Sequence, residues 1–294
     1  MENEVIILVI SHKEILNDKE QISLLQLYRI LGKYPIKFIC PQGLNISNYL
    51  KILPNADIDF IDAWWQSSYE NFNKLKIEPF LYKRYKKYQY ILFYEPDAFV
   101  FKDELQQWCE QGYDYIGAPW FVDFESKKSQ NFLGVGNGGF SLRKTSSLLD
   151  IWKFTNFFKI RKTIKELYNE LVVKNGKQKF HKKIRNFIYF LLKIIGIKNN
   201  PIHFKKEYIK KHEDLFWGLF IPKYFPNYKV ATVTEAIPFS FEFNPSLMYS
   251  LNDYKLPFGC HAWWKYDLGF WKPFVESYGY EIGEPKKEGN CEKQ

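Results

Sequence analysis

Cysteine and long apolar runs are scarce in this sequence of 294 residues. Its four cysteines, Cys40, Cys109, Cys260 and Cys291, form no C-x-x-C pair and no zinc-binding spacing, which favours a reduced, cytoplasmic protein. The apolar run at 5–10 is short and follows acidic rather than basic residues, so it is predicted to be a strand and not a signal peptide. No stretch approaches the roughly 18 apolar residues of a transmembrane helix.

The sequence also lacks a phosphate-binding P-loop, although it contains a glycine-rich segment. Residues 134–144 read GVGNGGFSLRK, and no G-K-[ST] follows the glycines. The segment comes too late in the chain for the usual dinucleotide fingerprint. Glycines permit a close approach of the backbone to a ligand. A glycine-rich hairpin explains the same residues, and both interpretations stay open here.

Positive charge is in excess, but one segment carries all of it. The net charge is +9, and residues 153–211 contain 17 Lys/Arg against three Asp/Glu, so the remainder is acidic. Within this segment, residues 180–200 combine apolar positions at helical spacing with flanking basic residues. Such a helix suggests an anionic membrane surface. A nucleic acid, or a solvated helix packed on the domain, are the alternatives.

The apolar pattern predicts an α/β fold in one domain spanning residues 1–294, with a basic helical insertion at 151–211. Runs of strand length at 5–10 and 36–40 enclose a segment of helical periodicity that Asn17 or Asp18 could cap. This order indicates parallel strands. The other predicted strands lie at 58–63, at 90–94, at 114–120 and after the turn in 137–144, and one or two more lie in 229–242. The other predicted helices are 68–88 with a break near Pro79, a helix capped by Asp103, and 212–222, which ends at Pro222.

Two acids interrupt the apolar run YILFYEPDAFVF at residues 90–101. Carboxylates are costly inside a buried strand, whereas the ends of parallel strands border the ligand site in α/β sheets. If the strand ends at Tyr94, Glu95 and Asp97 follow it on a bend and can converge on one Mg²⁺ or Mn²⁺. A turn with an aspartate cap is the alternative.

Two later motifs contain groups capable of acid–base or metal chemistry. HEDLFW places Glu213 and Asp214 at the start of a predicted helix, where carboxylates either cap the helix or act as a general base. FGCHAWW contains His261 among aromatic residues. A lone histidine of this kind is more often a buried core residue than a metal ligand.

In this order, YEPDAFVF, YIGAPW, VGNGGFSLR, HEDLFW and PFGCHAW resemble the motifs of a bacterial glycosyltransferase family known as a domain of unknown function (DUF5672-like). The resemblance runs from about residue 4 to 265 and omits much of 151–211. It implies the GT-A fold, in which helices flank a Rossmann-like, mostly parallel sheet. The motifs are also similar to those of the animal β-1,4-galactosyltransferases.

The resemblance implies roles for individual residues. Asp97 and His261 correspond to metal ligands, together with Glu95, which stands where the relatives usually carry an aspartate. Asp214 corresponds to the catalytic base, and Glu213 would bind sugar hydroxyl groups. The resemblance implies contacts of Ser11 and His12 with the nucleoside, and of Asn73 and Lys74 with the nucleotide, Lys74 reaching a phosphate. Glu95 would also contact the donor, and Asn137, Gly138 and Gly139 would form the pocket floor. Trp217 either stacks on a sugar or packs in the core.

These correspondences imply a metal-dependent hexosyltransferase that uses Mn²⁺ or Mg²⁺ and a nucleotide-sugar donor, UDP-linked by analogy. The implied acceptor is a glycan or lipid-linked glycan of bacterial surface polysaccharide synthesis, and the implied reaction is inverting. The expected location is cytoplasmic, peripheral at the inner face of the cell membrane through 180–200, with no nucleic acid partner. A non-catalytic nucleotide- or sugar-binding module of the same fold is the alternative, followed by a basic nucleic-acid-binding protein.

Overall fold

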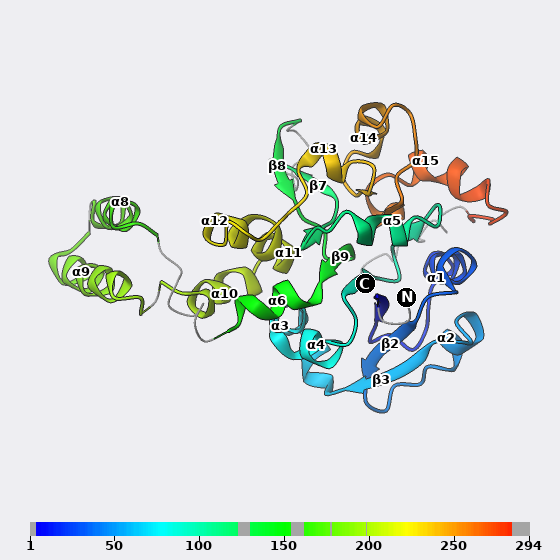
Figure 1. Cartoon of the computed structure of the whole chain (residues 1–294), viewed down its shortest axis with the longest axis horizontal. Helices are drawn as coiled ribbons and strands as arrows, with labels where there is room; N and C mark the ends of the chain where they lie inside the picture. Colours follow the sequence, from blue (N-terminus) through cyan, green and yellow to red (C-terminus); the bar gives the residue numbers. More distant parts are fainter. Residues whose placement is uncertain (1–3, 123–129, 154–161, 177, 198, 284–294) are drawn as a thin grey trace, which may run out of the picture.

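The computed structural model describes residues 4–122, 130–153, 162–176, 178–197 and 199–283. A six-stranded sheet forms its centre, with strand order β3-β2-β1-β4-β9-β6. A three-stranded sheet, ordered β10-β11-β5, and the pair β7-β8 accompany it. Figure 1 shows β2 and β3 at one end of the body and helices α14 and α15 at the other.

The large sheet is mostly parallel. Its strands are β1 (Val5–Ile10), β2 (Ile36–Pro41), β3 (Asp57–Ile61), β4 (Tyr90–Tyr94), β6 (Tyr115–Ile116) and β9 (Phe140–Lys144). Strands β3, β2, β1 and β4 run parallel to one another, whereas β9 is antiparallel to both β4 and β6. Every residue of β1 and β4 is buried, as expected for central strands covered on both faces. The predicted α/β class with a mostly parallel sheet is confirmed.

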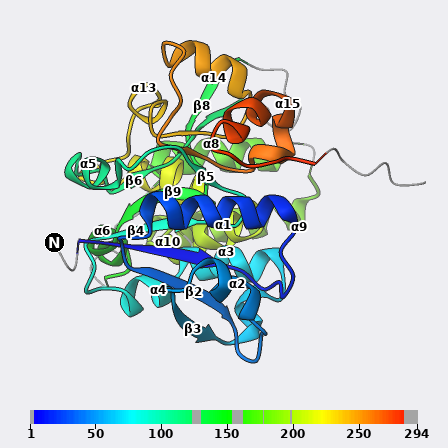
Figure 2. The same ribbon diagram turned by 90° about the vertical axis from the view of Figure 1, so that its right-hand side faces the viewer.

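Helix α1 (Asp18–Leu31) joins the two larger sheets. It begins with a capping box, in which the Asn17 side chain accepts a hydrogen bond from the Glu20 amide and the Glu20 carboxylate accepts one from the Asn17 amide. The Gln26 side chain donates to the Val100 carbonyl of the small sheet over 2.9 Å. Figure 2 shows α1 between the N-terminal strands and α15.

The small sheet contains three two-residue strands: β5 (Phe99–Val100), β10 (Ser240–Phe241) and β11 (Gly259–Cys260). Strands β10 and β11 are parallel, and β5 is antiparallel to β11. A second apolar cluster that includes Phe99, Trp263 and Trp271 surrounds them. Helix α14 (Pro245–Leu251) and helix α15 (Trp263–Glu276) complete this part of the molecule.

The remaining elements of the body are short. They are α2 (Ser47–Ile52), a 3₁₀ helix at Ala63–Gln66, α3 (Tyr69–Ile77), α4 (Pro79–Arg84), α5 (Leu105–Glu110), β7 (Pro119–Phe121), β8 (Phe132–Val135), α6 (Thr145–Ile151), α11 (Glu213–Leu215), α12 (Ile221–Tyr224) and α13 (Val233–Ala236). A π-helical turn at Phe216–Phe220 joins α11 to α12. The break predicted near Pro79 is confirmed by the boundary between α3 and α4.

Helices α8 (Ile164–Asn175), α9 (Phe180–Ile194) and α10 (Pro201–Ile209) fall within the segment predicted as an insertion. Figure 1 shows α8 and α9 at one end of the long axis, with α10 between them and the body. That residues 151–211 are an insertion into a single domain stays a prediction. Among the helices that the structure describes, none combines the length and apolar content needed to cross a bilayer.

Several local predictions were wrong. Asp103 does not cap α5; its carboxylate accepts a hydrogen bond from Tyr34 and pairs with Lys33. The helix predicted to end at Pro222 continues through it, because proline is tolerated in the first turn of α12. The strand predicted at 114–120 is divided between β6 and β7. By contrast, the prediction of one or two strands in 229–242 is confirmed by β10, although α13 occupies part of the same range.

Three of the four cysteines lie among the described residues. Cys40, Cys109 and Cys260 are buried free thiols, and burial raises the pKa of Cys40 to about 11. Cys291 lies outside the described residues.

Candidate active site

The strand directions bring three loops to one edge of the large sheet. Because β1 and β4 are parallel, Ser11 and Glu95 both follow strands at this edge. Because β9 is antiparallel to β4, the residues that precede β9 reach the same edge, and the Glu95 amide donates to the Gly139 carbonyl over 2.8 Å. Ligand sites in α/β folds lie beyond the carboxyl ends of parallel strands, as here.

The small sheet supplies further side chains to this edge. Asp97 precedes β5, His261 follows β11, and Glu242 follows β10. Since β5 is antiparallel to β11 while β10 is parallel to it, all three residues emerge at the same end of this sheet. The two sheets therefore meet at a cluster of three carboxylates and one imidazole.

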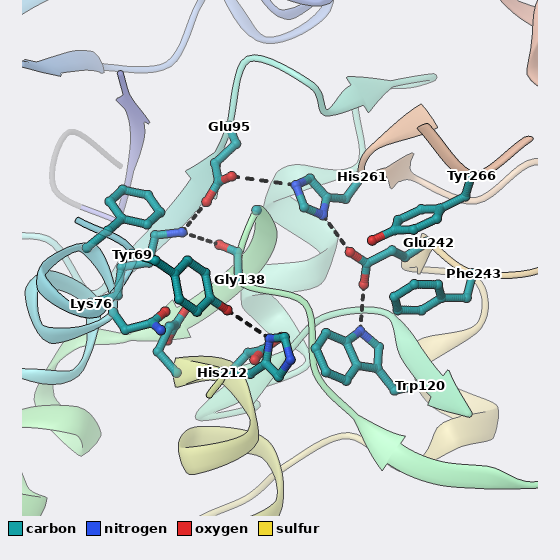
Figure 3. Close-up of a pocket in the computed structure, with 15 residues that line it drawn as sticks. Tyr69, Lys76, Glu95, Trp120, Gly138, His212, Glu242, Phe243, His261 and Tyr266 are labelled. Atoms are coloured by element: carbon teal, nitrogen blue, oxygen red, sulfur yellow. Dashed lines mark hydrogen bonds and ion pairs between the residues drawn. The ribbon is translucent and has the colours of Figure 1, made fainter. Parts of the chain in front are cut away.

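Glu95, Asp97 and His261 form a compact group. One ligand atom from each of the three lies within 4.8 Å of the others. His261 Nε2 is 3.1 Å from Asp97 Oδ1 and 3.6 Å from Glu95 Oε2. His261 Nδ1 is 2.7 Å from Glu242 Oε1, a contact drawn in Figure 3. Glu242 thus orients the imidazole with Nε2 toward the other two carboxylates.

The residues present fit a hard divalent cation. Two carboxylates and one imidazole are a donor set that suits Mn²⁺ or Mg²⁺. The buried Nε2 atom of His261 makes no hydrogen bond to any residue that the structure describes, although both carboxylates lie near it. An imidazole held by a carboxylate at Nδ1 and free to bind at Nε2 is the usual arrangement of a metal-ligating histidine.

Charged neighbours perturb each member of the cluster. Burial disfavours the charged form of His261, but Asp97, Glu242 and Glu95 outweigh it and raise the pKa of His261 well above its usual value. Burial acts to raise the pKa of Glu95, but Lys76 and His261 lower it to about 2. His261 and Lys265 similarly overcome burial and hold the pKa of Asp97 far below its usual range. Both carboxylates are therefore ionised near neutral pH.

Two pockets meet at this cluster. Pocket A, of about 540 Å³, lies between α3, the loop before β9, the start of α11 and the residues that follow β10 and β11. Pocket B, of about 460 Å³, lies between the loops that follow β1 and β4, the segment before α3 and Lys265. Glu95 lines both pockets, Asp97 lines pocket B and His261 lines pocket A. The candidate metal site is thus their common boundary.

Aromatic side chains form the walls of pocket A. Trp120, Phe243 and Tyr266 lie on the side of Glu242 in Figure 3, and Tyr69 lies across from them. The indole of Trp120 donates to Glu242 Oε2 over 2.5 Å. Flat apolar faces beside carboxylates suit a sugar ring, which has both apolar C–H faces and hydroxyl groups.

The acidic pair at the start of α11 is buried against pocket A. Glu213 forms a two-pronged ion pair with Arg143, with nitrogen–oxygen distances of 2.9 and 2.7 Å. Asp214 accepts hydrogen bonds from the amides of Asn137 (2.6 Å) and Leu215 (3.0 Å) and pairs with no cation among the described residues. Arg143 therefore fixes Glu213, whereas Asp214 forms no ion pair of its own among the described residues and feels the charge of Arg143 only from a distance.

This difference gives Asp214 an unusual proton affinity. Burial, followed by the charges of Glu213 and Glu242, raises the pKa of Asp214 to about 7, and the hydrogen bond from Asn137 opposes the rise only in part. A carboxylate with a pKa near neutrality is suited to accept a proton at physiological pH.

The glycines before β9 are required by close approach. A Cβ atom on Gly139 would lie 2.0 Å from His261 Nε2, and one on Gly138 would lie 2.3 Å from Glu213 Oε1. Asn137 has a φ of 77°, and its side chain accepts hydrogen bonds from the amides of Gly139 and Phe140. The glycine-rich segment is therefore both a turn before a strand and part of the site.

Some predicted site residues lie elsewhere. Lys74 contacts Asn71 and the Trp64 ring and lines neither pocket, and its role as a phosphate contact stays a prediction. Lys76, two residues on, lines pocket A. Trp217 is fully buried and donates to the Lys76 carbonyl, which corresponds to its packing alternative. Asn73 lines pocket A, but its amide is engaged with the carbonyls of 209 and 211.

Sequence reasoning missed four charged residues of the site. Lys76 contacts Glu95 and the Gly138 carbonyl, and Lys265 contacts Asp97. Arg143 and Glu242 hold Glu213 and His261. The only available signal was position, since Glu242 follows a strand-like run and Lys265 lies four residues after His261.

Three comparisons relate the chain to known proteins. A family model described as "Protein of unknown function (DUF5672)" matches residues 55–261. A search of curated proteins found no match. Among solved structures, the chain is similar to apo mouse xyloside xylosyltransferase 1, with a TM-score of 0.47 and 10% identity over 89% of this chain and 97% of that chain.

Two further solved structures are similar in shape. The galactosyltransferase LgtC in complex with donor and acceptor sugar analogues gives a TM-score of 0.40 and 13% identity over 96% of this chain and 98% of that chain. Core-mannan synthase A from Aspergillus fumigatus in its Mn/GDP form gives 0.35 and 13% over 59% and 65%. These similarities concern the path of the chain and not its site.

Proposed function

The chain belongs to the DUF5672 family of proteins of unknown function, and for this member we propose a metal-dependent glycosyltransferase of the GT-A type. In this proposal a sugar moves from a nucleotide-sugar donor to a hydroxyl group of an acceptor. The observation that carries the proposal is the Glu95–Asp97–His261 group at the boundary between two pockets, with Asp214 lining one of them.

The donor would occupy both pockets. Its nucleoside lies in pocket B beside Ser11 and His12, and its sugar lies in pocket A against the aromatic wall. Glu95, Asp97 and His261 hold a divalent cation, which when bound offsets the negative charge of the diphosphate as a Lewis acid. Lys76 and Lys265 add fixed positive charge beside the same boundary, the role first predicted for Lys74. The UDP identity rests on the motif resemblance.

Asp214 is the proposed general base. The acceptor oxygen forms a bond to C1 of the donor sugar as its proton passes to the Asp214 carboxylate, and the bond from C1 to the diphosphate oxygen breaks, releasing the nucleoside diphosphate. Attack from the face opposite the leaving group inverts the configuration at C1. Glu213, held by Arg143, presents its oxygens to sugar hydroxyl groups. A positioned base of this kind contributes about 10²–10⁴ in rate.

The biological setting follows from the motif resemblance. We propose a glycan or lipid-linked glycan acceptor in bacterial surface polysaccharide synthesis, and a cytoplasmic site of action. A non-catalytic sugar-binding module is disfavoured because binding alone does not call for a buried carboxylate with a pKa near neutrality.

Calorimetric titration of UDP tests the proposal. We expect wild-type protein to bind UDP with Mn²⁺ and not with EDTA, and Asp97→Ala to abolish the binding. Asp57→Ala, which removes an exposed aspartate remote from both pockets, is the matched control. Absence of metal-dependent binding to UDP, GDP, CDP and dTDP alike would contradict the proposal. Binding without release of UDP from any nucleotide-sugar would support the non-catalytic module instead.

A further inference from the structure

Helix α9 turns its apolar side away from the neighbouring helix α8. Its more polar side faces α8, where Asn186, Tyr189, Phe190 and Lys193 line a pocket of about 260 Å³ shared with α8. Asn186 donates to the Asn175 side chain over 2.9 Å, and Lys193 pairs with Glu170 at 2.8 Å. Both polar groups and the side chains of Phe190, Leu167 and Leu171 therefore lie between α8 and α9, and the fully apolar side of α9 faces outward.

The outward side is a continuous apolar stripe, which we call the α9 stripe. Its members recur three or four residues apart and so share one face of the helix. They are Phe180, Ile184, Phe187, Ile188, Leu191, Ile194 and Ile195, and all of them are exposed. The exposed fraction reaches 78% for Phe180 and 66% for Ile195, and no residue of α9 is buried. Contiguous exposed apolar surface of this kind marks an interaction site.

Positive charge accompanies the α9 stripe: by helical spacing, Lys183 and Arg185 lie toward its two sides and Lys182 lies on the opposite side of the helix. Lys182, Lys183 and Arg185 are exposed on the N-terminal half of α9. Between Glu170 and Glu207 the sequence contains ten Lys/Arg and no Asp/Glu. The surface that covers this stripe must therefore be apolar and carry negative charge at its rim.

We propose that the α9 stripe docks on an anionic lipid bilayer, with its aliphatic and aromatic side chains at the level of the acyl chains and the flanking cations at the headgroups. An interfacial helix with an apolar face and basic borders has this geometry. A second copy of the chain fits less well, because two such faces would bring like charges together. The position of α8 and α9 at one end of the long axis allows α9 to reach a flat surface (Figure 1).

Vesicle flotation of the full chain tests this docking. We expect binding to vesicles of phosphatidylcholine with phosphatidylglycerol at low salt, and none to pure phosphatidylcholine. Replacing Lys182, Lys183 and Arg185 with alanine should weaken the partition about 100-fold, at about fivefold per basic residue. Phe187→Ser with Leu191→Ser should weaken it at least about tenfold through lost apolar burial.

Matched controls separate docking from general effects. Lys83, Lys86 and Lys87 are exposed on or near α4, and their combined replacement by alanine removes the same charge but should leave vesicle binding unchanged. Phe60→Ser with Leu251→Ser removes two exposed apolar side chains outside the stripe. None of these changes touches the candidate active site, so metal-dependent UDP binding reports whether each variant is folded, independently of docking.

Three results would overturn the proposal. One is wild-type protein that ignores anionic vesicles at low salt. Another is a dimer in sedimentation that Phe187→Ser with Leu191→Ser dissociates while vesicle binding is absent, which would assign the stripe to a second copy. The last is nucleic acid that copurifies with wild type but not with the Lys182, Lys183 and Arg185 variant, again without vesicle binding.

Discussion

At the residue scale, the position of His261 depends on what is missing from Gly139. The imidazole occupies the space that a Cβ atom at residue 139 would need, since that atom would lie 2.0 Å from Nε2. The carbonyl of Gly139 also accepts a hydrogen bond from the amide of Glu95. A shift of residue 139 would therefore disturb Glu95, the second candidate metal ligand. One glycine therefore controls two of the three candidate metal ligands.

Gly139→Ala should accordingly displace His261 and weaken Mn²⁺-dependent UDP binding by about tenfold or more, as loss of ligand orientation does elsewhere. Calorimetry measures the effect. The control is Gly269→Ala, where the nearest atom to an added Cβ would be 3.6 Å away. Equal binding by the two variants would show that His261 is not a ligand.

Glu242→Gln tests the residue that orients His261. Glutamine keeps the size and can still accept from Trp120, but it removes the charge opposite Nδ1. We expect metal affinity to fall about 10- to 100-fold with little loss of folding stability. Glu276→Gln, on the surface of α15, is the matched control. Unchanged affinity in Glu242→Gln would remove Glu242 from the positioning role.

The raised pKa of Asp214 predicts how the rate of the proposed reaction depends on pH. With a pKa of about 7, its carboxylate is mostly protonated at pH 6 and mostly ionised at pH 8. We therefore expect kcat/KM to rise with pH through about 7 and to level off above about 8. Asp214→Asn should lower kcat by about 10²–10⁴ and remove this rise. A wild-type profile that is flat from pH 6 to 8 would argue against Asp214 as the base.

The raised pKa of Asp214 also predicts how the free energy of unfolding depends on pH. An unfolded aspartate loses its proton near pH 3.8, whereas folded Asp214 keeps it to about pH 7. Between these values the folded state binds more protons, so stability declines as pH rises. The Tm of Asp214→Asn should consequently fall less than that of wild type between pH 5 and 8, as measured by thermal denaturation. A parallel fall in both proteins would contradict the raised pKa.

At the scale of elements, loss of a helix cap should affect the body and the outlying helices differently. Asn17 caps α1, which contacts both sheets, and Thr163 caps α8, which packs on α9. Replacing either cap with alanine should cost about 1 kcal/mol. We expect Asn17→Ala to lower the global Tm by about 2–4 °C. Thr163→Ala should leave Tm unchanged and accelerate amide exchange only in α8 and α9. Uniform destabilisation by both would show that the helices unfold with the body.

The elements that sequence predicted were those with long or strongly marked patterns. The buried runs of β1, β2 and β4 and the capped helix α1 were confirmed. The two-residue strands β5, β10 and β11 have no periodicity to detect, because their pairing depends on partners far along the chain. The small sheet and its contribution of Glu242 were therefore not predictable.

The choice between Lys74 and Lys76 shows the same limit within one helix. Residues two apart on a helix are about 200° apart around its axis, so only one can face the site. Which one does so depends on the face that packs against the large sheet, and that is a property of the fold. The acid-x-acid motif was easier to place, because it follows the end of a strand in any α/β sheet.

At the scale of the whole molecule, charge is divided between two regions. The basic segment 153–211 includes α8, α9 and α10, whereas the remainder of the chain is net acidic. An anionic surface would attract one end of the molecule and repel the other. Binding should therefore weaken steeply with salt, since the interactions are largely screened beyond about 10 Å at 0.1 M.

The junction between the two sheets has a mechanical consequence. Glu95 is fixed to the large sheet, whereas Asp97 and His261 are fixed to the small one. Glu95, Asp97 and His261 would together hold a cation that links the two sheets and resists sliding of one against the other, and its removal would loosen the junction. Chelation should thus speed amide exchange in β10 and β11 while α8 and α9 keep their rates. The two sheets would then be held in fixed relative positions, as alignment of the substrates requires, only when metal and donor are bound.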